Sequence, residues 1–163
     1  MNYAAINKTD AANGPGVRVS LFVSGCQLAL DGHPCPGCHN YEAWKKDYGK
    51  IFTDEIKDEI IKALEPDYIS GFSLLGGEPL SSFNIPYEIS LLKKIKEKYP
   101  NKDIWMWTGY DLKKWIKRNN SKILEYVDYV IDGPYVESLR DPTLKFRGSS
   151  NQRIINLKDR NLS

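Results

Sequence analysis

The stretch Val17-Arg-Val-Ser-Leu-Phe-Val-Ser-Gly-Cys26 joins an apolar run directly to the first of three cysteines. Val17–Val23 is rich in β-branched and aromatic residues, which predicts a buried strand. The loop that carries the cysteines starts at the carboxyl end of this strand. The cysteines therefore follow the carboxyl end of a strand, which is where parallel sheets bind their ligands.

Outward from this strand, the apolar pattern alternates between the periods of helices and strands. Thr53 and Asp111 are predicted to cap helices because their side chains can accept bonds from free backbone N–H groups. Residues up to 15 and residues 136–150 carry no regular pattern and are predicted to be irregular. The predicted helices are 53–64, 85–98, 111–117 and one starting at 121, and the predicted strands are 68–75, 103–108, 128–132 and 153–157.

This alternation predicts an α/β protein built from parallel βαβ units. A full eightfold barrel needs about 250 residues, and the chain has 163. We therefore expect an open partial (β/α) barrel of parallel strands, truncated relative to a full TIM barrel. The length, with no linker or repeat, predicts that residues 1–163 form a single domain.

The cysteine content favours metal or redox chemistry over a disulfide framework. The chain has three cysteines, all in one loop, and an odd number cannot be fully paired within the chain. Three thiolates can ligate a 4Fe–4S cluster and leave one iron free for another ligand. The net charge of +2 gives no argument for nucleic acid or membrane binding. The start of the chain lacks signal-peptide features, so we expect a cytoplasmic protein.

Three further loops follow predicted parallel strands. They are Gly76-Gly-Glu-Pro79, Thr108-Gly-Tyr110 and Asp132-Gly-Pro-Tyr135. The carboxyl ends of parallel strands meet at one edge of a sheet or barrel, so these loops and the cysteine loop are predicted to surround one cavity. Paired glycines allow a backbone to approach a ligand closely. The backbone carbonyls there, or the Glu78 carboxylate, are candidate acceptors for an ammonium group.

Taken together, the cysteine loop and the Gly-Gly-Glu-Pro loop resemble those of the radical S-adenosylmethionine enzymes. Within them, the chain is similar to the activating proteins of anaerobic (class III) ribonucleotide reductases. The matching segments extend over nearly the whole chain, and their order is more specific than any one of them. They are Asn13-Gly-Pro-Gly-Val-Arg18, Phe22-Val-Ser-Gly-Cys26, Cys35-Pro-Gly-Cys-His-Asn40, Gly76-Gly-Glu-Pro79, Trp107-Thr-Gly-Tyr110, Asp132-Gly-Pro-Tyr135 and Arg147-Gly-Ser-Ser-Asn-Gln-Arg153.

The resemblance implies a partial barrel of the radical S-adenosylmethionine type and a set of site residues. The cluster ligands would be Cys26, Cys35 and Cys38. S-adenosylmethionine would bind the open iron, a glycyl radical would be installed on the anaerobic reductase, and a reduced flavodoxin or similar protein would donate the electron. The implied cofactor-binding residues are Gly37, Cys38, His39, Gly76, Gly77, Glu78, Pro79, Thr108, Asp132 and Gly133.

One spacing differs from the family pattern. Eight residues separate Cys26 from Cys35, five more than in the usual Cys-x3-Cys-x2-Cys arrangement. The cost of closing a loop grows only slowly with its length, so the longer loop is compatible with a cluster. It could form a flap over the cluster.

The longer loop also introduces His33, and this leaves an alternative open. His33 or His39 could complete a Cys3His zinc site with the three cysteines, as in a small binding module. A second alternative is a radical enzyme of the same type that acts on another glycyl radical enzyme or on a small molecule.

Overall fold

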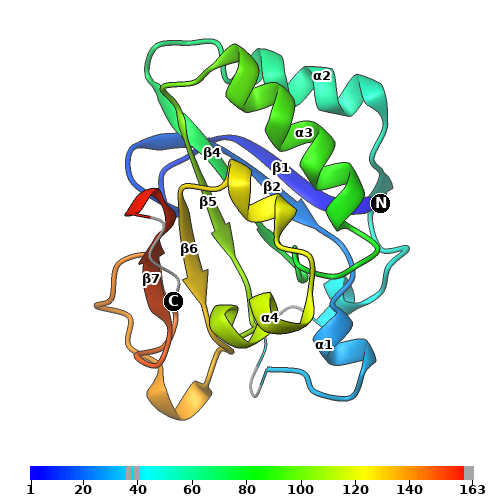
Figure 1. The fold of residues 1–163 in the computed structure, drawn as a ribbon, viewed down its shortest axis with the longest axis vertical. Helices are drawn as coiled ribbons and strands as arrows, with labels where there is room; N and C mark the ends of the chain where they lie inside the picture. The colour runs from blue at the N-terminus through cyan, green and yellow to red at the C-terminus, as the bar shows by residue number, and fades with distance from the viewer. Residues whose placement is uncertain (36–37, 39–40, 160–163) are drawn as a thin grey trace.

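The computed structural model describes residues 1–35, 38 and 41–159, and these form one mixed sheet with helices packed on it (Figure 1). The sheet has seven strands in the order β3-β1-β2-β4-β5-β6-β7. The strands are β1 (Asn2–Asp10), β2 (Val17–Val23), β3 (Lys50–Ile51), β4 (Ile69–Gly76), β5 (Asp103–Trp107), β6 (Tyr129–Asp132) and β7 (Arg153–Asn156).

The centre of the sheet confirms the predicted α/β pattern. Strands β2, β4, β5 and β6 run parallel to one another, and helices lie between them along the chain. Figure 1 shows α3 and α4 over one face of the sheet, and shows β5 and β6 pointing toward the end where α1 lies. The α-helices are α1 (Gln27–Leu30), α2 (Asp54–Ala63), α3 (Ile85–Lys98) and α4 (Leu112–Arg118).

The core lies between the helices and alternate residues of the central strands. Val19 and Leu21 of β2 and Leu74 of β4 are fully buried and belong to one apolar cluster that includes Ile60 of α2 and Leu92 of α3. Arg18 and Ser20 alternate with Val19 and Leu21 along β2 and face the opposite side of the sheet, as the twofold period of a strand requires. The second face of the sheet is therefore free to carry polar groups and the site.

The predicted helix starts are confirmed in two places. The hydroxyl of Thr53 accepts from the backbone N–H of Ile56 at 3.3 Å, and the carboxylate of Asp111 accepts from that of Lys114 at 3.2 Å. The segment after Ser121 is a 3₁₀ helix and not an α-helix. The 3₁₀ helices are η1 (Tyr41–Trp44), η2 (Lys122–Tyr126), η3 (Glu137–Leu139) and η4 (Leu157–Asp159).

Both edges of the sheet differ from a purely parallel arrangement. The prediction that the first fifteen residues are irregular was wrong, since β1 pairs antiparallel with β2 and with β3. Most β1 residues are polar or exposed, so no apolar pattern marks this strand. At the other edge β7 pairs antiparallel with β6. Residues 136–150, predicted to be irregular, contain η3 and a bridge between Arg140 and Ser149.

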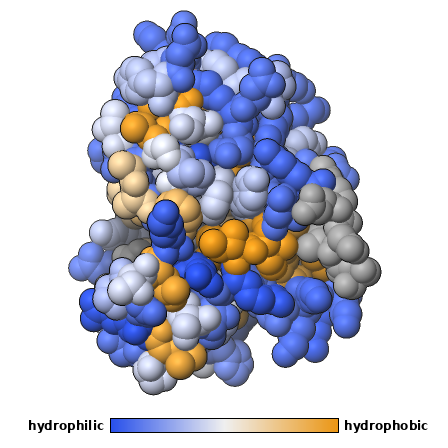
Figure 2. Space-filling model, turned by 90° about the vertical axis from the view of Figure 1, so that its left-hand side faces the viewer, coloured by the Kyte–Doolittle hydropathy of each residue, from blue (hydrophilic) through white to orange (hydrophobic). Residues whose placement is uncertain are grey.

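The side of the molecule on which the edge strand β7 lies is exposed to solvent. Figure 2 looks onto this side and shows a mostly hydrophilic surface with hydrophobic residues gathered near its middle. Ile154 of β7 is exposed there as part of an edge strand. Within residues 1–35, 38 and 41–159, no helix has both the length and the apolar character to cross a membrane.

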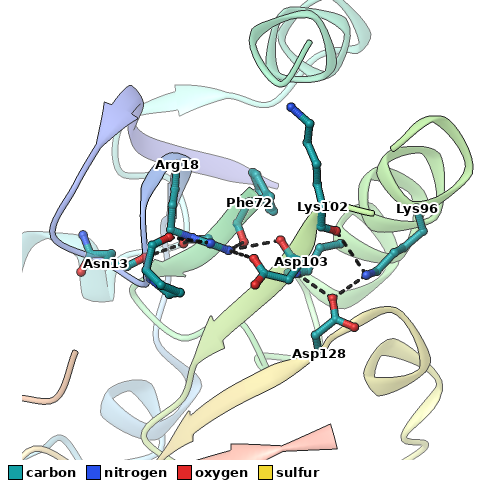
Figure 3. A network of polar contacts seen from close by, with 10 residues as sticks. Asn13, Arg18, Phe72, Lys96, Lys102, Asp103 and Asp128 are labelled. Atoms are coloured by element: carbon teal, nitrogen blue, oxygen red, sulfur yellow. Dashed lines mark hydrogen bonds and ion pairs between the residues drawn. The ribbon is translucent and has the colours of Figure 1, made fainter. Parts of the chain in front are cut away.

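A buried arginine lies near the amino-terminal ends of the parallel strands, on the sheet face opposite Val19 and Leu21 (Figure 3). Arg18 of β2 is fully buried, and its Nε donates to Ser73 Oγ at 2.8 Å. Its terminal nitrogens donate to the carbonyls of Pro15 and Phe72 and form an ion pair with Asp103 at 2.7 Å. Because these partners come from β4, β5 and the loop before β2, Arg18 ties β2 to both strands at the end of the sheet opposite the cysteine loop.

We expect Arg18→Met to lower the free energy of unfolding by about 3–5 kcal/mol, because the Asp103 carboxylate and the buried Phe72 carbonyl lose their cationic donor. Urea denaturation of the iron-free chain measures this change. Lys8→Met is the control, because the Lys8–Glu59 ion pair is exposed and its loss should cost below about 1 kcal/mol. Equal effects of the two substitutions would contradict the role of Arg18.

Candidate functional site

The three cysteines gather at the carboxyl ends of the parallel strands. They line one cavity of about 60 Å³, and Cys35 and Cys38 also line an adjoining cavity of about 240 Å³. The smaller cavity is lined by Cys26, Leu28, Cys35, Cys38, Trp44, Gly76, Gly77, Glu78 and Gly109. The larger is lined by Cys35, Cys38, Leu75, Gly76, Gly77, Trp107, Thr108, Gly109, Gly133, Tyr135 and Gln152.

The backbone around Cys26 is held by neighbouring segments. The N–H of Gly25 donates to the carbonyl of Ala43 at 2.7 Å, and the N–H of Cys26 donates to that of Trp44 at 3.1 Å. Burial raises the pKa of the Cys26 thiol to about 11 and also raises the pKa of the Cys35 thiol. Without a metal these thiols are protonated at neutral pH, so metal binding would have to release their protons.

The potential metal ligands that the structure describes do not converge on one point. In the described part of the chain, no three His, Cys, Asp or Glu side chains are grouped so that they could hold one metal ion. The thiolates that bind a 4Fe–4S cluster each ligate a different iron, so they do not need to converge on one point. His33 is exposed and does not line either cavity.

Gly76 and Gly77, at the end of β4, join the Gly-Gly-Glu-Pro loop to the cysteine loop. The N–H of Gly77 donates to the carbonyl of Val23 at 2.8 Å, and the N–H of Glu78 donates to that of Gly25 at 2.8 Å. Gly76 has φ +120°, a backbone conformation that favours glycine. A Cβ atom at Gly77 would lie 2.3 Å from the oxygen of Gly25, so the close contact of the two loops requires glycine here.

The carboxylate of Glu78 is occupied by donors from this protein. One oxygen accepts from the N–H of Leu80 at 2.8 Å and from the hydroxyl of Thr108 at 2.7 Å, and the other accepts from the N–H of Gly109 at 2.6 Å. Glu78 is buried, and burial raises the pKa of its carboxyl group to about 7 despite these donors. The side chain therefore ties the loop after β4 to the loop after β5.

This pKa predicts how stability depends on pH in the iron-free chain. Because the pKa of Glu78 is about 7 in the folded state and 4.5 ordinarily, the folded state binds the proton more tightly. The protonated Glu78 carboxyl group makes its full contribution to the free energy of unfolding below the unfolded pKa. This contribution, about 3 kcal/mol, is lost as the pH rises through the folded pKa. We expect the free energy of unfolding to fall between pH 5 and pH 8 in wild type.

Urea denaturation of wild type and Glu78→Gln at both pH values measures the effect, because the glutamine variant should lack this part of the fall. Glu97→Gln, at an exposed position of α3, is the control and should keep the wild-type pH dependence. A Glu78→Gln protein with an unchanged pH dependence would show that Glu78 does not titrate in this range.

The loop after β6 holds its own neighbours in a similar way. The buried carboxylate of Asp132 accepts from the N–H of Leu112, at the start of α4, and from Arg153. Gly133, with φ +102°, donates its N–H to the carbonyl of Tyr110 at 2.9 Å. Gly133 lines the larger cavity, whereas Asp132 lines neither, so Asp132 can act on a ligand only through the position of this loop.

The predicted site residues thus fall into three groups. Those that line a cavity are Cys26, Cys35, Cys38, Gly76, Gly77, Glu78, Thr108 and Gly133. Pro79 and Asp132 are buried and line neither cavity. Gly37 and His39 lie outside the described residues, so their part in the site stays a prediction.

Sequence reasoning did not assign seven of the lining residues to the site; they are Leu28, Trp44, Leu75, Trp107, Gly109, Tyr135 and Gln152. Gly109 and Tyr135 lie in loops that the sequence predicted at this edge, so their neighbourhood was the available signal. Leu28 lies in the long segment between Cys26 and Cys35, and nothing in its sequence indicates a contact with the loop after β5.

Comparison with known proteins identifies the family to which the chain belongs. The profile of a family described as "4Fe-4S single cluster domain" matches residues 12–155, which include all the cavity-lining residues. The chain thus belongs to a family of single-cluster iron–sulfur domains.

Relatives that match nearly the whole chain identify a more specific family. The chain is 41% identical to an anaerobic ribonucleoside-triphosphate reductase-activating protein of Escherichia coli (strain K12), over 97% of this chain and 100% of that protein. It is 43% identical to the protein of that name from Enterobacteria phage T4, over 94% and 93%, and 39% identical to that of Haemophilus influenzae, over 97% and 99%. The chain belongs to the family of anaerobic ribonucleoside-triphosphate reductase-activating proteins.

Proposed function

We propose that this protein is a radical S-adenosylmethionine enzyme that activates an anaerobic ribonucleoside-triphosphate reductase by installing a glycyl radical on it. The observation that carries the proposal is a cavity lined by all three cysteines and by Gly76 and Gly77 at the end of β4. Family membership supports the reductase as the partner, since the relatives are named for its activation.

We assign Cys26, Cys35 and Cys38 as the ligands of a 4Fe–4S cluster. Three protein thiolates leave one iron without a protein ligand, and the chain has no fourth cysteine to occupy it. When bound, the group would supply one electron for reductive cleavage of a carbon–sulfur bond of S-adenosylmethionine, and the 5′-deoxyadenosyl group released from methionine would take a hydrogen atom from a reductase glycine. The electron would come from a reduced flavodoxin or similar protein.

The protein's own residues position the reactants. Gly76 and Gly77 line both cavities, so their backbone is available to the methionyl end of S-adenosylmethionine beside the cluster. The Glu78 carboxylate already accepts from three donors, and we therefore assign it the role of fixing the loop, not of binding the ammonium group. The four parallel strands and their loops support a partial barrel of the radical S-adenosylmethionine type.

A hollow beside the larger cavity supports a macromolecular substrate. It has a volume of about 410 Å³ and shares Trp107, Tyr135 and Gln152 with that cavity. It continues past Arg147 to Asn13. The two hollows together offer a path along which a protein segment could reach the site.

The test is anaerobic reconstitution with iron and sulfide, then reduction with dithionite and addition of S-adenosylmethionine. We expect about four irons per chain and release of 5′-deoxyadenosine. Adding the anaerobic reductase should then produce a glycyl radical detectable by electron paramagnetic resonance. Cleavage without a glycyl radical would favour another substrate. A protein that keeps zinc and releases no 5′-deoxyadenosine would favour the Cys3His binding module.

A further inference from the structure

We propose that the segment between Cys26 and Cys35 is a fixed cover over the cysteine cavity, in which Leu28 shields the three thiols from solvent. Shielding of a bound cluster rests on the proposed function, whereas shielding of the thiols does not. The segment contains eight residues, and the structure describes all of them.

The segment is folded by its own backbone bonds. Helix α1 begins directly after Cys26, and the N–H of Leu30 donates to the carbonyl of Cys26 at 3.0 Å. The N–H of Asp31 donates to that of Gln27 at 2.9 Å, and the N–H of His33 donates to that of Leu28 at 2.7 Å. These bonds fold the chain from Cys26 to His33 into a compact turn, one side of which faces the cavity.

Gln27 attaches this turn to the loop that follows the glycine pair. Its N–H donates to the hydroxyl of Ser81 at 3.0 Å, and its side-chain oxygen accepts from the N–H of Ser82 at 3.0 Å. Ser81 is fully buried, so this attachment is made to a rigid part of the protein. The turn is therefore held against the cavity even without a bound group.

Leu28 and Leu30 lie on opposite sides of the turn. Leu28 lines the smaller cavity with all three cysteines, and its Cδ1 would lie 2.8 Å from a Cβ atom at Gly109, so it packs against the loop after β5. Leu30 is 51% exposed. Leu28 does not line the larger cavity, so the cover closes one side of the cysteine site and leaves the S-adenosylmethionine side open.

The chemical consequence is protection of the thiols and of what they bind. The reactivity of a cysteine depends on its accessibility, and the properties of an iron–sulfur cluster depend on its exposure to solvent. An apolar side chain over the cavity excludes water and slows the approach of oxygen or of an alkylating reagent.

The first test uses the iron-free chain under anaerobic conditions and measures iodoacetamide alkylation of each cysteine by peptide mass spectrometry. We expect Leu28→Ala to raise the alkylation rate of Cys26 several-fold over wild type. Gln27→Ala should raise it too, because it removes the side-chain bond to Ser82. Leu30→Ala is the matched control and should leave the rate unchanged. Equal rates in all variants, or an equal increase with Leu30→Ala, would overturn the proposal.

The second test uses the reconstituted protein and follows the loss of visible absorption in air. With equal iron content at the start, Leu28→Ala should bleach several-fold faster than wild type and Leu30→Ala. Equal bleaching rates would overturn the shielding of the cluster. If wild type takes up no iron, the proposed function fails, whereas the alkylation result still decides whether the cover exists.

Discussion

Replacement of any one cysteine should abolish the cleavage of S-adenosylmethionine. We expect Cys26→Ala, Cys35→Ala and Cys38→Ala each to lose cluster binding and to release no 5′-deoxyadenosine after anaerobic reconstitution. The physical reason is that the chain has no other cysteine to replace a lost ligand, and a cluster held by two thiolates exposes a second iron. Iron analysis and chromatography of the product measure the two effects.

The control for these variants lies in the same loop. His33→Ala removes an exposed side chain that lines neither cavity, so it should keep the iron content and activity of wild type. Loss of metal from His33→Ala would instead favour the Cys3His site. A single cysteine variant with wild-type iron content and cleavage would show that this residue is not a ligand.

The substitution Gly77→Ala should impair both the stability of the chain and its iron uptake. A Cβ atom at this position would lie 2.3 Å from the oxygen of Gly25 and 2.9 Å from that of Ala43, and neither backbone can move freely. The clash pushes the loop after β4 away from Gly25 and Cys26. We expect a lower melting temperature in the iron-free chain and fewer irons per chain after reconstitution.

Gly32 provides a matched control for this prediction. It lies in the same region with φ +86°, but a Cβ atom there would meet no atom within 4 Å. Gly32→Asn should therefore change neither property strongly, because asparagine tolerates this backbone conformation. If Gly77→Ala melts and binds iron as wild type does, the close contact between the two loops is not required.

The central fold could be predicted because its signals are local. Apolar residues in α2 and α3 recur at helical spacing, and Thr53 and Asp111 accept the capping bonds expected of them. β1 could not be predicted in the same way. Its nine residues are mostly polar or exposed, and only pairing with β2 and β3 makes them a strand.

The candidate site could be predicted as a place more readily than as a set of roles. The cysteine, Gly-Gly-Glu-Pro and Thr-Gly-Tyr loops meet as expected because each follows a parallel strand. Two roles were not visible. Glu78 bonds to Thr108 and Gly109, thirty or more residues away, and Leu28 packs against Gly109 across the cavity.

Local sequence patterns predict that three thiols follow a buried strand and that this strand begins a parallel α/β array. Both are read from neighbouring residues, since period and spacing are local properties. Three features are visible only in the folded chain: Arg18 is buried beside Asp103, the Glu78 carboxylate bonds to the protein's own loops, and Leu28 lines the cysteine cavity. These depend on contacts between distant segments, whose partners no local pattern specifies.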